Sequence, residues 1–506
     1  MEGPIRYVST RGSLIQLTFS QALTTGIAED GGLLVPNEIP EITDWESDWV
    51  GLGFRECCRR VLVLFGGEAL ESGPARSTGP QPSSNLSDLI RSAYCKFREP
   101  KVVKIVERPA KEPQYFFELF HGPTFSFKDV ALQLLGEMLA EVQNCPINCP
   151  SLCLIGATSG DTGSAALAGV KGKTGIKCLI FYPLGRVSDI QERQMLEFNK
   201  DFNCKSIAVK DATFDDCQAH VKKLFAEHRE LFSGVNSINW ARIAVQIAYY
   251  VYAVGVTSLR GPSSKPVNFF VPTGNFGNIL AAFYAKRMGV PIGHLVLGSN
   301  ENDVLPRFLE SGVYSCRKLK PTISPSMDIM VSSNFERLLW EIFRKNWGTE
   351  KASARVKALF CSLASTGSFT VSPEELNLIR REISGFSITE TETLETIHKE
   401  WQKNGYLLCP HSAVGVTAMQ KWRTGGRGET RGNICVLTAD VGKFVQGIKE
   451  GWLARRSLDQ DFFDALDAAV PEELSRLDQI PVEELRLVVR NDFEAIEGVA
   501  VRFATE

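Results

Sequence analysis

The sequence predicts an α/β protein with a largely parallel sheet. From about Val102 onward, short β-branched or aromatic runs alternate with helical runs, beginning with YFFELF and a helix from Phe127. The series continues with SLCLIGA, KCLIFYP, VNFFVP, HLVLGSN and NICVLTA. This alternation is typical of strands joined by crossover helices. Ligands of such sheets bind at the carboxyl ends of the strands, so we expect the functional residues there.

The length of 506 residues exceeds what one hydrophobic core comfortably supports, so we expect several compact units. An N-terminal lobe is predicted over residues 1–100, with a proline-rich surface loop, ESGPARSTGPQPSSN, near its end. The main region would span 101–506. It would contain a smaller subdomain at about 150–235 and a mostly helical insertion at about 302–400. The segment after Trp452 is expected to be an acidic helical tail on the surface.

Composition and charge exclude several classes of function. The formal net charge of -3 gives no basic field for nucleic acid. No apolar run reaches the roughly 18 residues that a membrane span requires. The start of the chain, MEGPIRYVSTRGS, has neither the apolar core of a secretory signal nor an Arg-rich transit pattern, so we expect a cytosolic protein.

Three of the 13 cysteines, Cys145, Cys149 and Cys153, have a spacing of four that could ligate a metal ion. Cys153, however, falls in the apolar strand SLCLIG, whose side chains should point into a core. We therefore predict no metal site.

Lys128 is the first candidate catalytic residue. In FELFHGPTFSFKDV it follows a strand and a Gly-Pro turn, and it falls in the first turn of a helix. The positive end of the helix dipole and burial between Phe125 and Phe127 both disfavour the ammonium form, so the lysine pKa should be lowered. A neutral amine can form a Schiff base. From this segment alone, a surface lysine paired with Asp129 is an equal alternative.

Two glycine-rich loops favour the catalytic interpretation of Lys128. In VNFFVPTGNFGNIL a strand ends, and a turn leads into a helix whose first amides can bind a phosphate. This turn consists of Gly274, Asn275, Phe276, Gly277 and Asn278. The pattern recurs in CLIGATSGDTGSAALAG, where a second anion could bind Ser159, Gly160, Asp161, Thr162, Gly163 and Ser164. One such loop is weak evidence, since tight turns need glycine for backbone angles alone, but two loops and a lysine are stronger.

A third anion site is indicated by GVNSINWARIAVQ. Arg242 lies there close behind Asn236, Ser237 and Asn239, at the start of a helix. A guanidinium with neighbouring amide donors suits a phosphate monoester. Taken singly, Arg242 is as well explained by a structural salt bridge.

In their order and distances, the motifs resemble the threonine synthase family, and within it the threonine synthase-like 2 branch. They are YVSTRG, TFSQALTTGIAEDGGLLVP, LFHGPTFSFKDVALQLL, GATSGDTGSAA, NSINWARI, PTGNFGNIL and LTADVGKF, and they span most of the chain. The resemblance implies a fold-type II, tryptophan-synthase-β-like enzyme with two open α/β domains around a cleft and an N-terminal lobe. It implies pyridoxal 5'-phosphate as cofactor and a small phosphorylated amino acid as substrate. We expect a monomer or homodimer.

The resemblance also implies a role for each candidate residue. Lys128 would bond the cofactor aldehyde, and residues 274–278 would hold the cofactor phosphate. Thr438 would face the pyridine nitrogen, and Asp161 would lie near the phenolic oxygen. The substrate carboxylate would bind the loop from Ser159 to Gly163, which includes Gly160 and Thr162. The substrate phosphate would bind Asn236, Ser237 and Arg242.

Two reactions fit this resemblance. A phospho-lyase would eliminate phosphate from O-phosphohomoserine and O-phosphothreonine to give 2-oxobutyrate and ammonia, whereas a threonine synthase would convert O-phosphohomoserine to threonine. After Thr-Ala the family usually has His-Pro-Ala-Lys-Phe, where this chain has Asp440 to Phe444. An Asp440 that faces the site could prevent placement of the hydrating water while elimination survives, but one that faces away would change nothing.

Together with the threonine synthase-like 2 resemblance, the altered motif favours the lyase over the synthase. A non-catalytic binding protein on the same fold is the remote alternative. It is disfavoured because such a protein has no physical need for Lys128 beside two anion-binding loops and Arg242.

Overall fold

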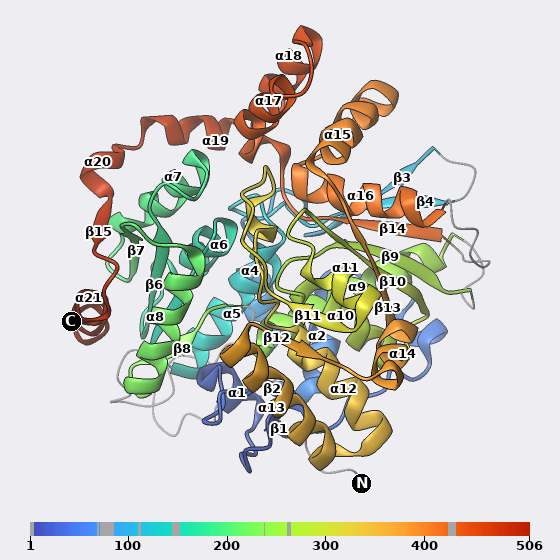
Figure 1. Cartoon of the computed structure of the whole chain (residues 1–506), viewed down its shortest axis with the longest axis vertical. Helices are drawn as coiled ribbons and strands as arrows, with labels where there is room; N and C mark the ends of the chain where they lie inside the picture. The colour runs from blue at the N-terminus through green and yellow to red at the C-terminus, as the bar shows by residue number, and fades with distance from the viewer. Residues whose placement is uncertain are drawn as a thin grey trace.

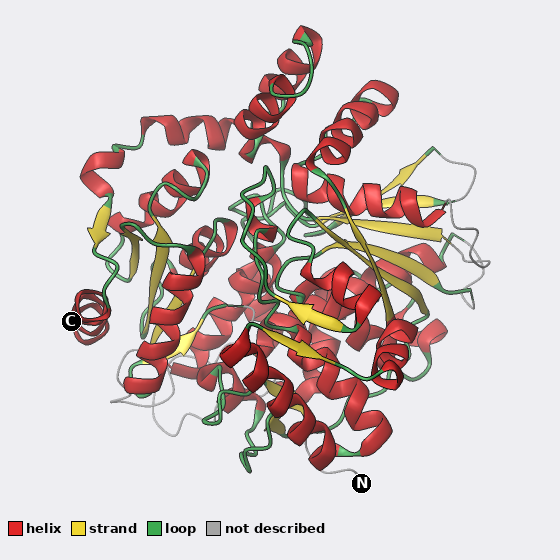
Figure 2. Cartoon of the chain, in the orientation of Figure 1, coloured by secondary structure: helices red, strands yellow, loops and turns green. Residues whose placement is uncertain are grey.

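Two β-sheets lie at the centre of the computed structural model, each flanked by helices (Figure 1, Figure 2). The structure describes residues 5–67, 70, 85–109, 113–143, 152–236, 238–260, 265–423 and 432–506. The predicted surface loop lies outside these ranges apart from Asn85, as do Cys145, Cys149 and Ser237. None of the helices within the described ranges is long and apolar enough to cross a membrane.

The larger sheet has six strands in the order β13-β10-β9-β14-β4-β3. All neighbours are parallel except β3 and β4, which are antiparallel. The central strands β9 and β14 are buried at every residue, as expected where helices cover both faces. The strands are β3 (Lys104–Arg108), β4 (Gln114–Glu118), β9 (Val267–Pro272), β10 (Ile292–Ser299), β13 (Ile383–Ser387) and β14 (Gly432–Leu437).

The smaller sheet has five parallel strands in the order β15-β7-β6-β5-β8. Four of them come from one continuous segment within the range 150–235, and the fifth comes from the C-terminal end of the chain. The strands are β5 (Leu152–Ala157), β6 (Ile176–Pro183), β7 (Cys204–Val209), β8 (Phe232–Gly234) and β15 (Leu487–Val489). The flanking elements are α6 (Asp161–Val170), α7 (Asp189–Glu197), η3 (Phe198–Lys200) and α8 (Phe214–Glu227).

Long buried helices pack against the sheets and against one another. They are α5 (Lys128–Gln143), α9 (Trp240–Ser258), α10 (Gly277–Arg287) and α16 (Pro410–Arg423). The N-terminal segment packs its hydrophobic side chains into the same core as α9, with Tyr7 and Trp240 rings 5.8 Å apart. It therefore has no core of its own. Its elements are β1 (Tyr7–Ser9), α1 (Phe19–Thr25), β2 (Leu34–Pro36), η1 (Trp45–Trp49), α2 (Phe54–Leu62), η2 (Val63–Gly67) and α4 (Leu86–Ala93).

The segment from 302 to 400 is mainly helical, but it also supplies strand β13 at one edge of the larger sheet. Its other two strands form a small antiparallel pair. The elements besides β13 are α11 (Val304–Ser311), β11 (Val313–Ser315), η4 (Pro325–Met327), α12 (Phe335–Trp347), α13 (Thr349–Thr366), β12 (Ser368–Thr370), α14 (Pro373–Glu382) and α15 (Glu390–Asn404).

The C-terminal segment is more than a surface tail, because it runs from the larger sheet to the smaller one and adds β15 to that sheet (Figure 1). The last helix buries Ile496 and Ala500 in the core of the smaller sheet. The elements are η5 (Val441–Lys443), α17 (Val445–Leu453), α18 (Gln460–Ala468), α19 (Glu472–Ser475), η6 (Arg476–Gln479), α20 (Val482–Leu485) and α21 (Phe493–Thr505).

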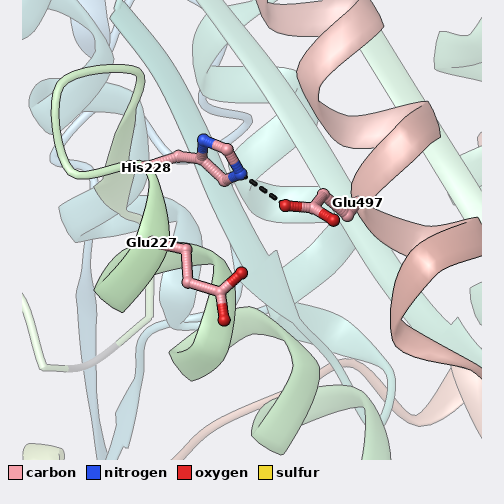
Figure 3. Close-up of side chains that lie close together, drawn as sticks. All are labelled: Glu227, His228 and Glu497. Atoms are coloured by element: carbon pink, nitrogen blue, oxygen red, sulfur yellow. Dashed lines mark hydrogen bonds and ion pairs between the residues drawn. The ribbon is translucent and has the colours of Figure 1, made fainter.

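A polar contact also joins α21 to the end of α8. The ring Nε2 of His228 lies 2.6 Å from Oε1 of Glu497, and Glu227 lies beside them (Figure 3). One ligand atom from each of the three side chains falls within 4.8 Å of the others. These side chains are exposed or partly exposed and lie where α8 meets α21. We therefore interpret the cluster as a polar contact that holds α21 against α8 rather than as a metal site.

The close packing of α5 on α6 gives a prediction about stability. A Cβ atom on Gly136 would lie 2.0 Å from the carbonyl oxygen of Gly169, so Gly136→Ala should force the helices apart. We expect a loss of about 3 kcal/mol in the free energy of unfolding, measured by urea denaturation. Gly498 is the control, because nothing lies within 4 Å of its Cβ position in α21, and Gly498→Ala should stabilise slightly. Equal effects of the two substitutions would contradict this account.

Candidate active site

A cavity lies where the carboxyl ends of strands from both sheets meet. Loops that follow β4, β5, β9 and β14 supply most of its wall, which agrees with the expected place for a ligand in parallel sheets. Its lining residues are Phe127, Lys128, Ala157, Thr158, Ser159, Asp161, Thr162, Phe214, Asn236, Arg242, Gln246, Pro272, Thr273, Gly274, Asn275, Phe276, Gly277, Asn278, Ser326, Met327, His411 and Thr438.

Lys128 begins α5 and points its amine into this cavity, with 11% of its side chain exposed. The turn before it is fixed to the end of β14, because the amide of Phe127 donates to the carbonyl of Thr438 at 2.8 Å. Burial lowers the pKa of Lys128 to about 8, although Asp161 opposes this shift. At pH 7 roughly one amine in ten is then neutral, far more than for an ordinary lysine.

The loop from Thr273 to Asn278 leads from β9 into α10 and forms an anion-binding turn. Phe276 has a positive φ of 65°, and α10 starts at Gly277. The first amides of α10 therefore have no intrahelical partners, and the residues that carry them lie in the cavity wall. A Cβ on Gly274 would lie 3.0 Å from the carbonyl oxygen of Ser326, so only glycine fits without a shift. Within the described residues, Oδ1 of Asn275 and Nδ2 of Asn278 are buried without a hydrogen-bond partner.

In the loop after β5, some residues line the cavity and others stabilise the loop itself. Ser159, Asp161 and Thr162 line the cavity. Gly160 and Gly163 do not line the cavity. Their amides donate to the hydroxyl of Thr158, at 3.0 and 3.1 Å, and so are already paired within the loop. A Cβ on Gly163 would lie 2.4 Å from the sulfur of Met195, so this glycine serves close packing.

Arg242 is buried at the wall of the cavity, and burial lowers its pKa to about 10. One of its nitrogens donates to the carbonyl of Val235 at 3.2 Å, and its Nε has no partner among the described residues. No carboxylate pairs with it within the described chain, so the predicted salt-bridge alternative is absent there. Asn236 lies beside it, with an unpartnered Oδ1. A buried guanidinium without a counter-ion suits an anionic ligand.

Several residues that the sequence motifs did not indicate complete the site. His411 accepts the amide hydrogen of Ser326 at its Nε2, and burial lowers the histidine pKa to about 3, so the ring is neutral. Ser326 lies 3.4 Å from the Lys128 amine. Gln246 lines the cavity one helical turn after Arg242, a spacing that could have identified it. Lys443, which belongs to the last sequence motif, is hydrogen-bonded to Asp161 of the cavity wall.

Asp440 does not line the cavity. Its carboxylate accepts the amide hydrogen of Gly442 at 2.8 Å and caps the turn of η5. Burial raises the pKa of Asp440, whereas the nearby Arg98 opposes that shift. The side chain is therefore engaged in local structure, and this placement favours the alternative in which the altered motif leaves the cavity wall unchanged.

The residues present fit a cofactor that carries both an aldehyde and a phosphate. The depressed pKa of Lys128 provides a reactive amine, and the Gly274 loop offers amides and unpartnered side-chain groups for a dianion. Thr438 places a hydroxyl on the wall, at the end of the central strand β14. Pyridoxal phosphate has the chemical groups that this arrangement would bind.

Comparisons with known proteins agree with this fit. Residues 108–366 match the family model for pyridoxal-phosphate dependent enzymes, and residues 6–76 match that for the threonine synthase N terminus. A crystal structure of PLP-bound threonine synthase from Brucella melitensis has a TM-score of 0.81 and 37% identity, over 99% of this chain and 100% of that one. The protein is therefore a fold-type II enzyme that depends on pyridoxal 5'-phosphate.

Similarity over the whole length identifies the family. Threonine synthase from Saccharomyces cerevisiae is 37% identical over 97% of this chain and 96% of its own. The crystal structure of yeast threonine synthase has a TM-score of 0.85 and 35% identity, and the match covers 99% of this chain and 98% of that one. Threonine synthase-like 2 from Mus musculus is 32% identical over 88% of this chain and 89% of its own. The chain belongs to the threonine synthase family.

Proposed function

We propose that the protein is a threonine synthase that converts O-phosphohomoserine and water to threonine and phosphate. The observation that carries the phosphorylated substrate is the buried Arg242 beside Asn236, which has no counter-ion among the described residues and so offers a second anion site apart from the Gly274 loop. The choice of the synthase reaction follows from the similarity to threonine synthases over the whole chain. The relatives named threonine synthase are more similar to this chain than those named threonine synthase-like 2. We favour the synthase over the lyase that the sequence indicated, because the relatives support the synthase more strongly and Asp440 does not line the cavity.

When bound, pyridoxal phosphate stabilises negative charge that develops at the substrate's carbon atoms. The amides of residues 274–278 would hold its phosphate, and the hydroxyl of Thr438 would face its ring nitrogen. A hydroxyl, unlike a carboxylate, does not require that nitrogen to be protonated. Asp161 would lie near the phenolic oxygen, where its negative charge is held by Lys443.

The remaining residues would bind and orient the substrate. Hydroxyls of Ser159 and Thr162 would hold its carboxylate, while Arg242 and Asn236 would bind its phosphate and the phosphate that is released. The neutral amine of Lys128 would remove the proton from the substrate Cα and can return it at a neighbouring carbon. Deep burial of Arg242 keeps water from competing for the phosphate.

Phospho-lyase activity, giving 2-oxobutyrate, ammonia and phosphate from O-phosphohomoserine or O-phosphothreonine, is the second candidate. The match to threonine synthase-like 2 supports it. Both reactions share the early proton transfers, and they differ in whether water adds before release. The same residues therefore serve both, and only the products separate them.

The test is product stoichiometry with each substrate. The pyridoxal-phosphate-loaded protein is incubated with O-phosphohomoserine and, separately, with O-phosphothreonine, and phosphate, threonine and 2-oxobutyrate are quantified. We expect phosphate matched by threonine from O-phosphohomoserine. Phosphate matched by 2-oxobutyrate without threonine would establish the lyase instead.

Asp440→Ala should leave the ratio of threonine to 2-oxobutyrate unchanged, because the carboxylate caps its own turn and does not line the cavity. Loss of the cap should lower the free energy of unfolding by about 1 kcal/mol. Product analysis and a urea melt measure the two effects. A shift toward 2-oxobutyrate in the variant would show that Asp440 does help to place water.

A further inference from the structure

Lys443 is completely buried behind the cavity wall. Its side chain is 0% exposed, and its ammonium donates to Oδ1 of Asp161 at 2.6 Å and to the carbonyl of Thr124 at 2.9 Å. It ends the short helix η5, two residues beyond Val441 and five residues beyond Thr438. Lys443 is not among the residues that line the cavity, so it would act on a ligand only through a neighbour.

That neighbour is Asp161, whose carboxylate lies between two lysines. Oδ1 accepts from Lys443 at 2.6 Å and from the amide of Gln191 at 2.9 Å. Oδ2 accepts from the hydroxyl of Ser326 at 3.2 Å and lies 3.6 Å from the Lys128 amine. The two contacts are unequal. Lys443 holds the carboxylate directly, whereas Lys128 is 1 Å farther away and not in hydrogen-bond contact with it.

The charges around Lys128 explain why the shorter contact of Lys443 with Asp161 matters. Around the Lys128 amine lie one carboxylate, Asp161, and two cations, Lys443 and Arg242, while His411 is neutral. Asp129 also interacts electrostatically with Lys443, and its carboxylate accepts hydrogen bonds from the amide and hydroxyl of Thr124. Since Lys443 already neutralises Asp161, a proton on Lys128 would add a third buried cation. Without Lys443, Asp161 would be free to pair with a protonated Lys128.

We propose that Lys443 is a positioning residue whose ammonium neutralises Asp161, so that Asp161 does less to hold a proton on Lys128 and a larger share of the amine can bond the cofactor aldehyde. The proposal rests on the proposed role of Lys128, and it does not depend on which products the enzyme forms. It gives a function to the lysine of the altered motif, whose first three residues, 440–442, differ from the usual family pattern.

The test measures the protonation of Lys128 in cofactor-free protein. Trace labelling with acetic anhydride at a series of pH values, followed by peptide mass spectrometry, gives the midpoint at which Lys128 becomes reactive. The neutral variants are Lys443→Met and Lys443→Gln. Glutamine can still donate to Asp161 and Thr124, so it removes the charge while retaining the local hydrogen bonds. Lys443→Arg keeps the charge, and Lys449→Met removes a lysine that pairs with Asp467.

We expect Lys128 in the wild type, Lys443→Arg and Lys449→Met to become reactive near pH 8. In the neutral Lys443 variants the midpoint should rise by about one pH unit, so labelling at pH 7.5 should fall about eightfold. Unfolding would also raise the midpoint, so each variant must first show a cooperative thermal transition above the assay temperature. An unchanged midpoint in a folded neutral variant would overturn the proposal. A failed product assay would leave this result untouched.

Discussion

Lys128→Ala should reduce phosphate release from O-phosphohomoserine by about 10³- to 10⁴-fold, because it removes both the amine that bonds the cofactor and the base for the substrate Cα proton. The amine is already suited to both roles, since burial lowers its pKa to about 8. Phosphate release under saturating substrate measures the loss.

The control for this variant is Lys449→Ala, which removes an ion pair between α17 and α18, remote from the cavity lining, and should leave turnover unchanged. Cofactor content must be measured alongside, because the Gly274 loop does not depend on Lys128 and should still retain cofactor. Turnover of the alanine variant within tenfold of the wild type would show that Lys128 is not the reactive amine.

Arg242→Met should lower kcat/KM for the phosphorylated substrate by about 10²- to 10³-fold. The reason is that the buried guanidinium would donate charge-assisted hydrogen bonds to the substrate phosphate. The free energy of unfolding, in contrast, should not fall. An unpaired buried cation costs free energy, so its replacement by a neutral side chain should leave the free energy of unfolding unchanged or higher by about 1 kcal/mol.

Arg337 provides the matched control for this prediction. It is equally buried, and burial likewise lowers its pKa to about 10, but it donates to the carbonyls of Leu34 and Ile238 and to the side chain of Asn334. Arg337→Met should therefore destabilise by several kcal/mol without specific loss of substrate affinity. If Arg242→Met destabilises as strongly as Arg337→Met, Arg242 is a structural residue and the assignment of the phosphate site fails.

Local patterns along the chain were sufficient to predict the parallel α/β fold and the strand-to-helix loops that line the cavity. VNFFVP and NICVLTA lie in the buried central strands β9 and β14, as the apolar runs indicated. Lys128 and the Gly274 loop both lie at helix starts that follow strands, so strand, turn and helix signals placed them without knowledge of long-range contacts.

Features that depend on long-range contacts could not be predicted in this way. The strand β15 has only three residues, and nothing in LVV indicates that it pairs with β7 nearly 280 residues earlier. Gly163 looked like an anion-binding residue, but its packing against Met195 is visible only in three dimensions. The pairing of Lys443 with Asp161 joins residues 282 positions apart. The sequence left two orientations of Asp440 open, and its cap of the η5 turn is visible only in the structure.

The most direct test of the account is to identify the lysine that bonds the cofactor. The pyridoxal-phosphate-loaded protein is reduced with borohydride, digested, and mapped by mass spectrometry. We expect the pyridoxyl mass on the peptide that contains Lys128, in about one equivalent per chain. The same mass on Lys443, the other lysine in contact with Asp161, or the absence of any lysine adduct would contradict the assignment of the active site.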